Sequence, residues 1–331
     1  MEYPGSPQGE KGTVSPDYAA LVDAQTWAFI QRVNAFYPPE AIGMPITKNR
    51  EVYERTSRAF FAGYPEGVAA ETSAIAAAGY SIPIRIYRPG QPSKAATVLY
   101  FHGGGFILGS LDSHDDICAE LSAATGYTLV SVGYRLAPEH SHHETLDDVV
   151  AAFNWAAEAF SEPLVLVGES AGGTLAACLA RQSRGHPRAP VGQVLIYPYL
   201  GGDMETGSYV AHADAPMLTT RDLRTYVATW TGGADVAADL RFMPLADDDF
   251  SGLPPTVIFS AECDPLSSDG KIYCERVRAA GGLAYQWEEH GLIHGYLRGR
   301  HMVDRARASF ARIIHAIKAP SLSRAGLTRR G

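Results

Sequence analysis

Cysteine is scarce in this chain of 331 residues, which has four, at Cys118, Cys178, Cys263 and Cys274. No pair of them is spaced as C-x-x-C, so the sequence predicts neither a disulfide framework nor a zinc site. We expect Cys178, which lies in a run of small residues, to fill space inside a buried helix.

Long apolar runs and an excess of positive charge are also missing. No segment approaches the roughly 20 apolar residues of a membrane span, and the first residues lack the cationic and apolar regions of a secretion signal. The formal net charge of −8 argues against a nucleic-acid-binding surface. We therefore expect a cytoplasmic protein that binds neither membranes nor nucleic acids.

The strongest positive feature is Gly168-Glu169-Ser170-Ala171-Gly172, which follows an apolar run at 164–167. Gly-x-Ser-x-Gly between a strand and a helix is typical of a nucleophile elbow, a sharp turn that presents the serine hydroxyl at the sheet edge. Ser170 is therefore the candidate nucleophile. Glu169 could bond to a cap over the active site or adjust local pKa values, and we favour a structural role for it.

Three adjacent glycines, Gly103, Gly104 and Gly105, follow an apolar run at 96–101. Acyl transfer passes through a tetrahedral oxyanion, which needs preorganised N–H donors. Glycines let the backbone approach that oxygen, and the N–H of Ala171, directly after the nucleophile, would complete the oxyanion hole. A flexible turn is the simpler interpretation of the glycines, but the elbow favours the oxyanion hole.

A candidate catalytic acid, Asp264, follows the apolar run at 256–259. An acid at the carboxyl end of a strand lies where α/β enzymes place their functional groups. Glu262 and Asp269 are rivals, and Asp269 could simply be an acid in the first turn of the next helix. Pro265 fixes the turn after Asp264, which favours Asp264.

A candidate base, His294, precedes Gly295 in a loop after a strand-like stretch at 284–288. His290 is its rival. The order Ser170, Asp264, His294 is the order in which α/β-hydrolases carry their triad. This order favours His294 as the general base.

Strand and helix signals alternate along most of the chain, which predicts a mainly parallel sheet with helices on both faces. The strand candidates are Ile82–Tyr87, Ala96–Phe101, Tyr127–Val132, Leu164–Val167, Gly192–Tyr197, Thr256–Phe259 and Ala284–Glu288. The helix candidates are Leu146–Ala159, Ser268–Ala280 and Val303–Ile317.

Two segments depart from this alternation. After a loose segment at 1–14, a helix is predicted from Ser15 to the proline pair at 38–39, and we expect it to lie apart from the sheet core. Residues 201–250 contain apolar helical positions but no strand signal. The acids at 247–249 are expected to form a solvated turn, and the histidines at 140, 142 and 143 a polar loop rather than a metal site.

Together these motifs resemble the bacterial hormone-sensitive-lipase family of carboxylesterases, a branch of the α/β-hydrolases. The matching stretches are 102–106, 134–140, 168–173, 264–266 and 294–296. Position 296 is often Phe in that family and is Tyr296 here, a phenol that either meets the leaving group or packs. Relatives also often carry a proline-rich stretch where this chain has Ser141-His142-His143-Glu144.

The resemblance implies the α/β-hydrolase fold with a helical cap, and hydrolysis of short-chain acyl esters without cofactor or metal, often by a dimer. It implies a triad of Ser170, Asp264 and His294, with an oxyanion hole from Gly104, Gly105, the adjacent Gly103, and Ala171. The expected divisions are a cap segment at 1–60, the catalytic core at 61–200 and 251–331, and inserted cap helices at 201–250.

Two other functions remain open at this point. Lactone, carbamate or amide hydrolysis would use the same catalytic groups, so the sequence does not separate them from ester hydrolysis. The other alternative is a non-catalytic small-ligand receptor, because the plant gibberellin receptor resembles this family but lacks the catalytic histidine. The presence of His294 weighs against a receptor.

Overall fold

The computed structural model describes residues 16–37, 44–77 and 79–318. The strands are β1 Ala69–Ala77, β2 Tyr80–Arg88, β3 Thr97–Phe101, β4 Thr128–Val132, β5 Leu164–Glu169, β6 Gly192–Ile196, β7 Thr256–Cys263 and β8 Ala284–Ile293. The α-helices are α1 Tyr18–Leu21, α2 Ala24–Asn34, α3 Ile46–Phe60, α4 Asp115–Thr125, α5 His142–Ala159, α6 Ala171–Gln182, α7 Gly207–Ala211, α8 Thr220–Thr231, α9 Ser267–Ala279 and α10 Asp304–Lys318. Two 3-10 turns are η1 Pro244–Ala246 and η2 Tyr296–Gly299.

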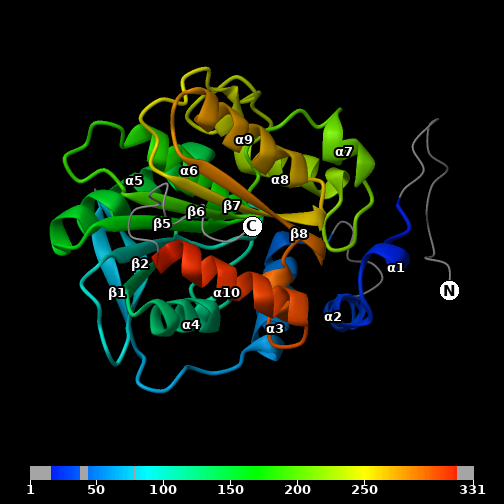
Figure 1. Ribbon diagram of the computed structural model, residues 1–331, viewed down its shortest axis with the longest axis horizontal. Helices are drawn as coiled ribbons and strands as arrows, with labels where there is room; N and C mark the ends of the chain where they lie inside the picture. Colours follow the sequence, from blue (N-terminus) through cyan, green and yellow to red (C-terminus); the bar gives the residue numbers. More distant parts are fainter. Residues whose placement is uncertain (1–15, 38–43, 78, 319–331) are drawn as a thin grey trace.

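The strands form one eight-stranded sheet in the order β1-β2-β4-β3-β5-β6-β7-β8. β1 pairs with β2, and β2 with β4, in antiparallel fashion. All pairs from β4 to β8 are parallel. The predicted mainly parallel sheet is confirmed, and Figure 1 shows its helices lying above and below the strands.

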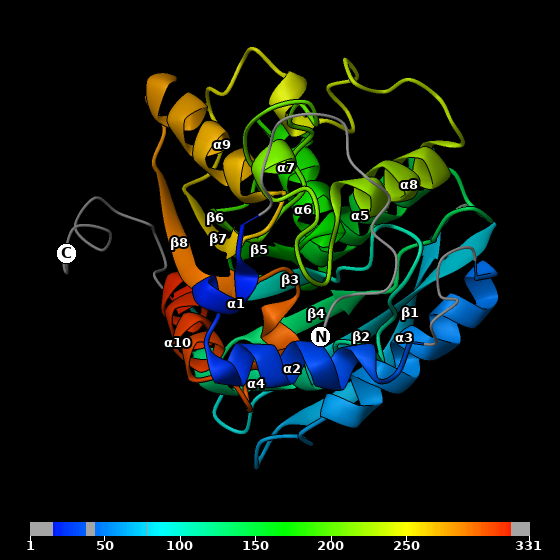
Figure 2. The same cartoon turned by 90° about the vertical axis from the view of Figure 1, so that its right-hand side faces the viewer.

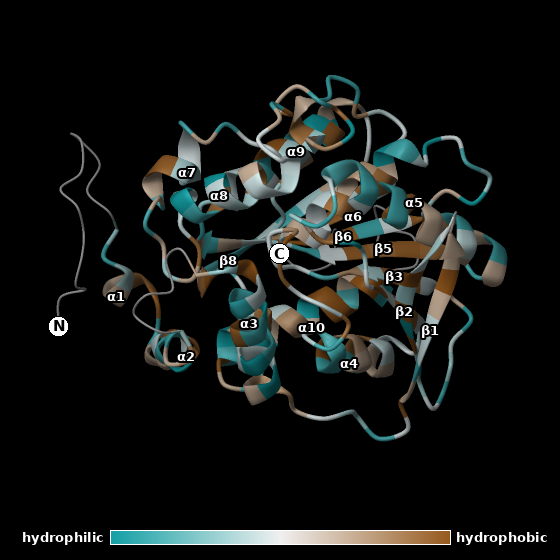
Figure 3. Cartoon of the chain, turned by 180° about the vertical axis from the view of Figure 1, so that it is seen from behind, coloured by the Kyte–Doolittle hydropathy of each residue, from teal (hydrophilic) through white to brown (hydrophobic). Residues whose placement is uncertain are grey.

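The central strands are buried on both faces, which is why they appear in the sequence as continuous apolar runs. In β3, Leu99 and Phe101 belong to one apolar cluster, while Val98 and Tyr100 belong to a second on the opposite face. Helices α5, α6 and α9 contribute to the first cluster, which contains Leu99 and Phe101. Helices α4 and α10 contribute to the second cluster, which contains Val98 and Tyr100. Figure 3 shows the hydrophobic colouring concentrated in these strands.

Every predicted strand is present, but β1 was not predicted. Its burial pattern explains the omission, because Ile75 is its one buried residue. Helices α3 and α4 were also not predicted. The prediction that residues 142 and 143 form a polar loop is wrong: Ser141 caps α5 in a capping box with Glu144, so both histidines lie in its first turn.

The predicted N-terminal helix is divided into two. Asp17 caps α1 and Asp23 caps α2, each accepting a hydrogen bond from a backbone N–H of its helix. The expectation that this helix lies apart from the sheet core is wrong, because Phe29 and Val33 belong to the second apolar cluster. Residues 1–14 and the prolines at 38–39 lie outside the described residues.

Residues 201–250 contain α7, α8 and η1 and, as predicted, no strand. The hydroxyl of Tyr18 lies 3.1 Å from Nδ1 of His212, so the N-terminal segment touches the inserted one. Figure 2 shows α1, α2 and α7 on the side facing the viewer. The expected solvated turn is wrong for Asp247, which is buried and accepts hydrogen bonds from Arg181 and Arg184.

Candidate active site

Ser170 occupies a strained turn between β5 and α6, with φ of 52° and ψ of −121°. A Cβ at Gly168 would lie 2.1 Å from the carbonyl oxygen of Gly172, and a Cβ at Gly172 would lie 2.1 Å from that of Phe101. Side chains at these two positions would therefore collide with backbone. The backbone N–H of Ser170 donates to Ile196 O at 2.9 Å, which ties the turn to β6.

His294 lies between Ser170 and Asp264. Its Nε2 is 2.8 Å from the Ser170 hydroxyl oxygen, and its Nδ1 is 2.7 Å from Oδ2 of Asp264. The carboxylate of Asp264 can only accept, so a neutral His294 carries its proton on Nδ1 and presents Nε2 as an acceptor to the hydroxyl. The structure thus brings the three predicted residues together in the geometry of proton transfer from serine.

Asp264 is completely buried, and its second oxygen accepts the backbone N–H of Leu266 at 2.9 Å. The rivals make other contacts. Glu262 accepts the backbone N–H of Gly291 at 2.7 Å, and His290 is exposed. Asp269 accepts from the backbone N–H of Leu200 at 2.7 Å and from the Tyr209 hydroxyl.

The buried carboxyl group of Asp269 should make the free energy of unfolding depend on pH. Burial raises its pKa to about 7, despite opposing hydrogen bonds from Leu200 and Tyr209, whereas its ordinary value is 3.8. A carboxyl whose pKa is raised by folding contributes stability below its unfolded pKa and loses it as the pH rises through the folded value. We expect its contribution to the free energy of unfolding to fall between about pH 4 and pH 7, by at most about 1.4 kcal/mol per pH unit.

Urea unfolding of the wild type and Asp269→Asn across that range measures this contribution. The variant should lack the component of the slope that Asp269 supplies, so its stability should depend less on pH. Parallel stability curves for the two proteins would contradict the prediction.

The glycine loop after β3 adopts backbone conformations that favour glycine. Gly104 and Gly105 have φ of 123° and 61°. A Cβ at Gly104 would lie 2.3 Å from the carbonyl oxygen of Leu108. In residues 16–37, 44–77 and 79–318, no hydrogen bond uses the backbone N–H of Gly104, Gly105 or Ala171. Gly103 differs, because its N–H points to Oε1 of Glu169 at 3.4 Å.

Helix α8 packs directly over this loop. A Cβ at Gly105 would lie 2.7 Å from Cγ of Tyr226, so the tyrosine ring rests on the glycine. Phe106 stacks on Trp230 with ring centroids 3.8 Å apart. The inserted segment therefore covers the loop that carries the free amides.

Of the two roles expected for Tyr296, meeting the leaving group or packing, the packing role is confirmed. The side chain is buried, and its hydroxyl lies 2.7 Å from Oγ of Ser309 in α10.

Glu169 is buried as well and contacts His114 and Tyr197. Neither partner was singled out from the sequence, because each is remote from Glu169 along the chain and lies in no recognisable motif.

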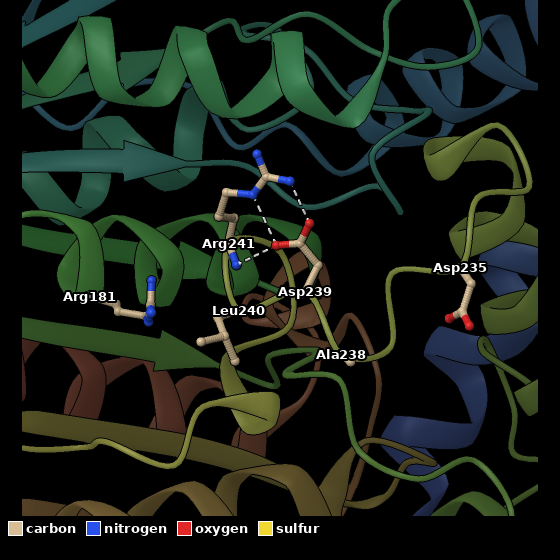
Figure 4. A pocket seen from close by; sticks show the side chains of 6 residues that line it. All are labelled: Arg181, Asp235, Ala238, Asp239, Leu240 and Arg241. Atoms are coloured by element: carbon tan, nitrogen blue, oxygen red, sulfur yellow. Dashed lines mark hydrogen bonds and ion pairs between the residues drawn. The ribbon is translucent and has the colours of Figure 1, made fainter.

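A surface pocket lies elsewhere and contains none of the three residues of the Ser170 site. It is lined by Arg181, Asp235, Ala238, Asp239, Leu240 and Arg241. Figure 4 shows the guanidinium of Arg241 directed at the carboxylate of Asp239. Arg181 in turn pairs with Asp247. These charges have protein partners, so the pocket is a weaker candidate for catalysis than Ser170.

All four cysteines are free and buried, as expected for Cys178. Within the described ranges, no group of three or more His, Cys, Asp or Glu side chains is placed to hold a metal ion. The same part of the chain contains no helix with the length and apolarity needed to cross a membrane.

A family model described as the alpha/beta hydrolase fold matches residues 98–298. The chain belongs to this family. Carboxylesterase NlhH of Mycobacterium tuberculosis is 36% identical to it over 249 residues, which are 72% of this chain and 78% of the relative. Ethyl acetate hydrolase of Pseudomonas putida is 33% identical over 251 residues, which are 72% and 79% of the two chains.

A solved structure with a similar fold is also that of an esterase. A hyperthermophilic esterase from the archaeon Pyrobaculum calidifontis superposes with a TM-score of 0.82 at 29% identity, covering 90% of this chain and 98% of the esterase. The resemblance to the hormone-sensitive-lipase family is confirmed, and this member is a carboxylic ester hydrolase.

Proposed function

We propose that the protein is a serine carboxylesterase that hydrolyses short-chain acyl esters through a Ser170–His294–Asp264 triad and an acyl-enzyme intermediate. The observation that carries the proposal is the continuous hydrogen-bonded chain from the Ser170 hydroxyl through His294 to the buried carboxylate of Asp264. This chain supplies a nucleophile, a general base and the group that orients the base.

In the first half of the reaction, Nε2 of His294 takes the proton of Ser170 as the serine oxygen attacks the ester carbonyl. Asp264 holds the imidazole in the required tautomer and stabilises the imidazolium that forms. The amides of Gly104, Gly105 and Ala171 donate to the oxyanion. Gly103 lies adjacent and supports the loop through Glu169.

The tetrahedral intermediate collapses when the alcohol leaves with the proton held by His294. Water then attacks the acyl-enzyme, with His294 again accepting a proton, and the carboxylic acid is released as Ser170 is regenerated. All proton transfers use side chains, so the proposed mechanism requires no metal and no cofactor.

The segments 1–60 and 201–250 form the cap in this proposal, and 61–200 with 251–331 form the catalytic core. The contact between Tyr18 and His212 supports a joint cap, and the ring of Tyr226 on Gly105 supports its position over the oxyanion loop. Aromatic rings this close to the loop favour small acyl groups. Ethyl acetate hydrolase, one of the relatives, is named for an ester of a two-carbon acid.

Hydrolysis of p-nitrophenyl esters, from acetate to a long-chain acyl group, tests the substrate class. We expect the ratio kcat/KM to be highest for short chains and to fall as the acyl chain lengthens. A maximum at long chains would contradict the short-chain assignment. No hydrolysis at any length would favour lactones, carbamates or amides.

Gly105→Ala tests the proposed oxyanion loop. The added methyl group meets the ring of Tyr226, and φ of 61° is strained for alanine. We expect kcat to fall by about 100-fold, comparable to the loss of one oxyanion donor. The double variant Gly105→Ala/Tyr226→Ala removes the clash and should recover part of the loss. An unchanged kcat in Gly105→Ala would exclude this loop from catalysis.

A further inference from the structure

Glu169, the residue before the nucleophile, is a buried carboxylate. Its side chain is bonded by three groups from three different parts of the chain. Nε2 of His114 and the N–H of Gly103 lie at Oε1, and the Tyr197 hydroxyl donates to Oε2. Both Glu169 and His114 are almost inaccessible to solvent, at 5% and 1% of their surface.

The carboxylate is ionised in this environment. Burial raises the pKa of Glu169, but the interaction with His114 and the hydrogen bonds from His114 and Tyr197 outweigh burial and lower the pKa to about 2. A buried carboxylate is seldom the most stable solution for a protein interior, because its desolvation offsets much of the attraction of its partners. Its presence beside the nucleophile therefore calls for a role besides stability.

The first connection runs to the oxyanion loop. A Cβ at Gly103 would lie 3.1 Å from Oε1 of Glu169, so the loop backbone rests on the carboxylate. His102, just before the loop, stacks between His114 and Tyr134, with centroids 5.4 and 4.3 Å away. The Tyr134 hydroxyl donates to His102 O at 2.7 Å. The start of the loop is thus held on several sides.

The second connection runs to the base. The ring of Tyr197 lies against the imidazole of His294, with centroids 4.8 Å apart. The Tyr197 backbone has a positive φ of 36° and is fixed by its N–H to Phe259 O at 2.6 Å. The hydroxyl of Tyr197 donates to Oε2 of Glu169. The carboxylate therefore helps to fix the position of the ring that contacts His294.

We propose that Glu169 is a positioning residue that aligns both the oxyanion amides and His294 with Ser170. It acts through Gly103 on the neighbouring Gly104 and Gly105, and through Tyr197 on the imidazole. This inference rests on the proposed serine-esterase function. Because Glu169 meets neither substrate nor reacting atoms, its loss should weaken transition-state stabilisation and leave ground-state binding intact.

The test measures kcat and KM for p-nitrophenyl acetate in Glu169→Ala and Glu169→Gln. Active sites are counted by complete reaction with diethyl p-nitrophenyl phosphate, so kcat refers to reactive serine and not to total protein. We expect kcat per site to fall about 10- to 100-fold in Glu169→Ala, somewhat less than the largest losses of an oxyanion donor. KM should stay within about threefold. Glu169→Gln still accepts from Tyr197 and should lose less.

Asp247→Asn is the matched control. Asp247 is a similarly buried acid that pairs with Arg181 in α6, the helix that follows Ser170, but it does not touch the glycine loop. This variant should lower Tm while its kcat per site remains unchanged. If Glu169→Ala behaves in the same way, with lower Tm and normal kcat per site, Glu169 is only a stabilising residue and the inference is wrong.

Two further variants keep the inference testable if Glu169→Ala does not fold. Tyr197→Phe removes only the hydroxyl and should reduce kcat per site several-fold, and an unchanged value would overturn the connection to His294. His114→Asn combined with Glu169→Gln should lose no more activity than the worse single variant, and additive losses would show that the two residues act independently, against the inference.

Failure of the proposed function is recognised separately, because then the wild type would show no Ser170-dependent hydrolysis.

Discussion

Replacing Ser170 with alanine is expected to lower kcat for ester hydrolysis by about a million-fold, the scale of losing the nucleophile of a serine hydrolase. Without the hydroxyl, no acyl-enzyme can form, and His294 has no proton to accept from position 170. The oxyanion amides remain and can support only slow attack by water. The measurement is hydrolysis of p-nitrophenyl acetate by the purified variant.

The fold should survive this change, because the Ser170 side chain makes its hydrogen bond to His294 and none of the contacts that close the turn. Those contacts come from the backbone, through Ser170 N and O to Ile196, Gly173 and Thr174. Ser183→Ala is a matched control: Ser183 follows the same helix α6, and its hydroxyl donates to Leu179 O. Circular dichroism should be unchanged in both variants, and near-wild-type hydrolysis by Ser170→Ala would refute the mechanism.

The parts of the fold that could be predicted are those buried on both faces. Strands such as β3 and β5 bury consecutive residues and therefore carry continuous apolar runs. β1 pairs only with β2 at the sheet edge, and Ile75 is its one buried residue, so no such run exists. The short break between α1 and α2 lies at Val22 and Asp23, where the backbone is extended and Asp23 caps α2. A helical stripe of apolar residues does not indicate such a break.

The residues of the candidate site likewise fall into those that could be predicted from the sequence and those that could not. Ser170 and the glycines could be proposed because a tight turn demands particular residues at neighbouring positions, which leaves a local pattern. The partners of Glu169 could not be proposed, since His114 and Tyr197 reach it through the folded sheet and loops. The burial of Asp247 escaped prediction for the same reason: its arginine partners lie in or just after α6.

The second large effect is expected at the acid: Asp264→Asn should reduce kcat by about 10,000-fold. The structure determines which way the new amide points. One oxygen of Asp264 accepts the N–H of Leu266, so the asparagine must keep its carbonyl oxygen there and turn its NH2 group toward His294. A donor facing Nδ1 forces the imidazole proton onto Nε2, where it meets the Ser170 hydroxyl and blocks removal of the serine proton.

Asp269→Asn serves as the comparison, because Asp269 is an equally buried acid whose contacts are Leu200, Gly202 and Tyr209 rather than His294. We expect its kcat to stay within about tenfold of the wild type, since it orients no group in the proposed triad. The ratio between the two variants isolates the tautomer effect from the general effect of altering a buried carboxylate. A larger loss in Asp269→Asn than in Asp264→Asn would reassign the catalytic acid, and similar small losses would mean that the orientation of His294 does not limit the reaction.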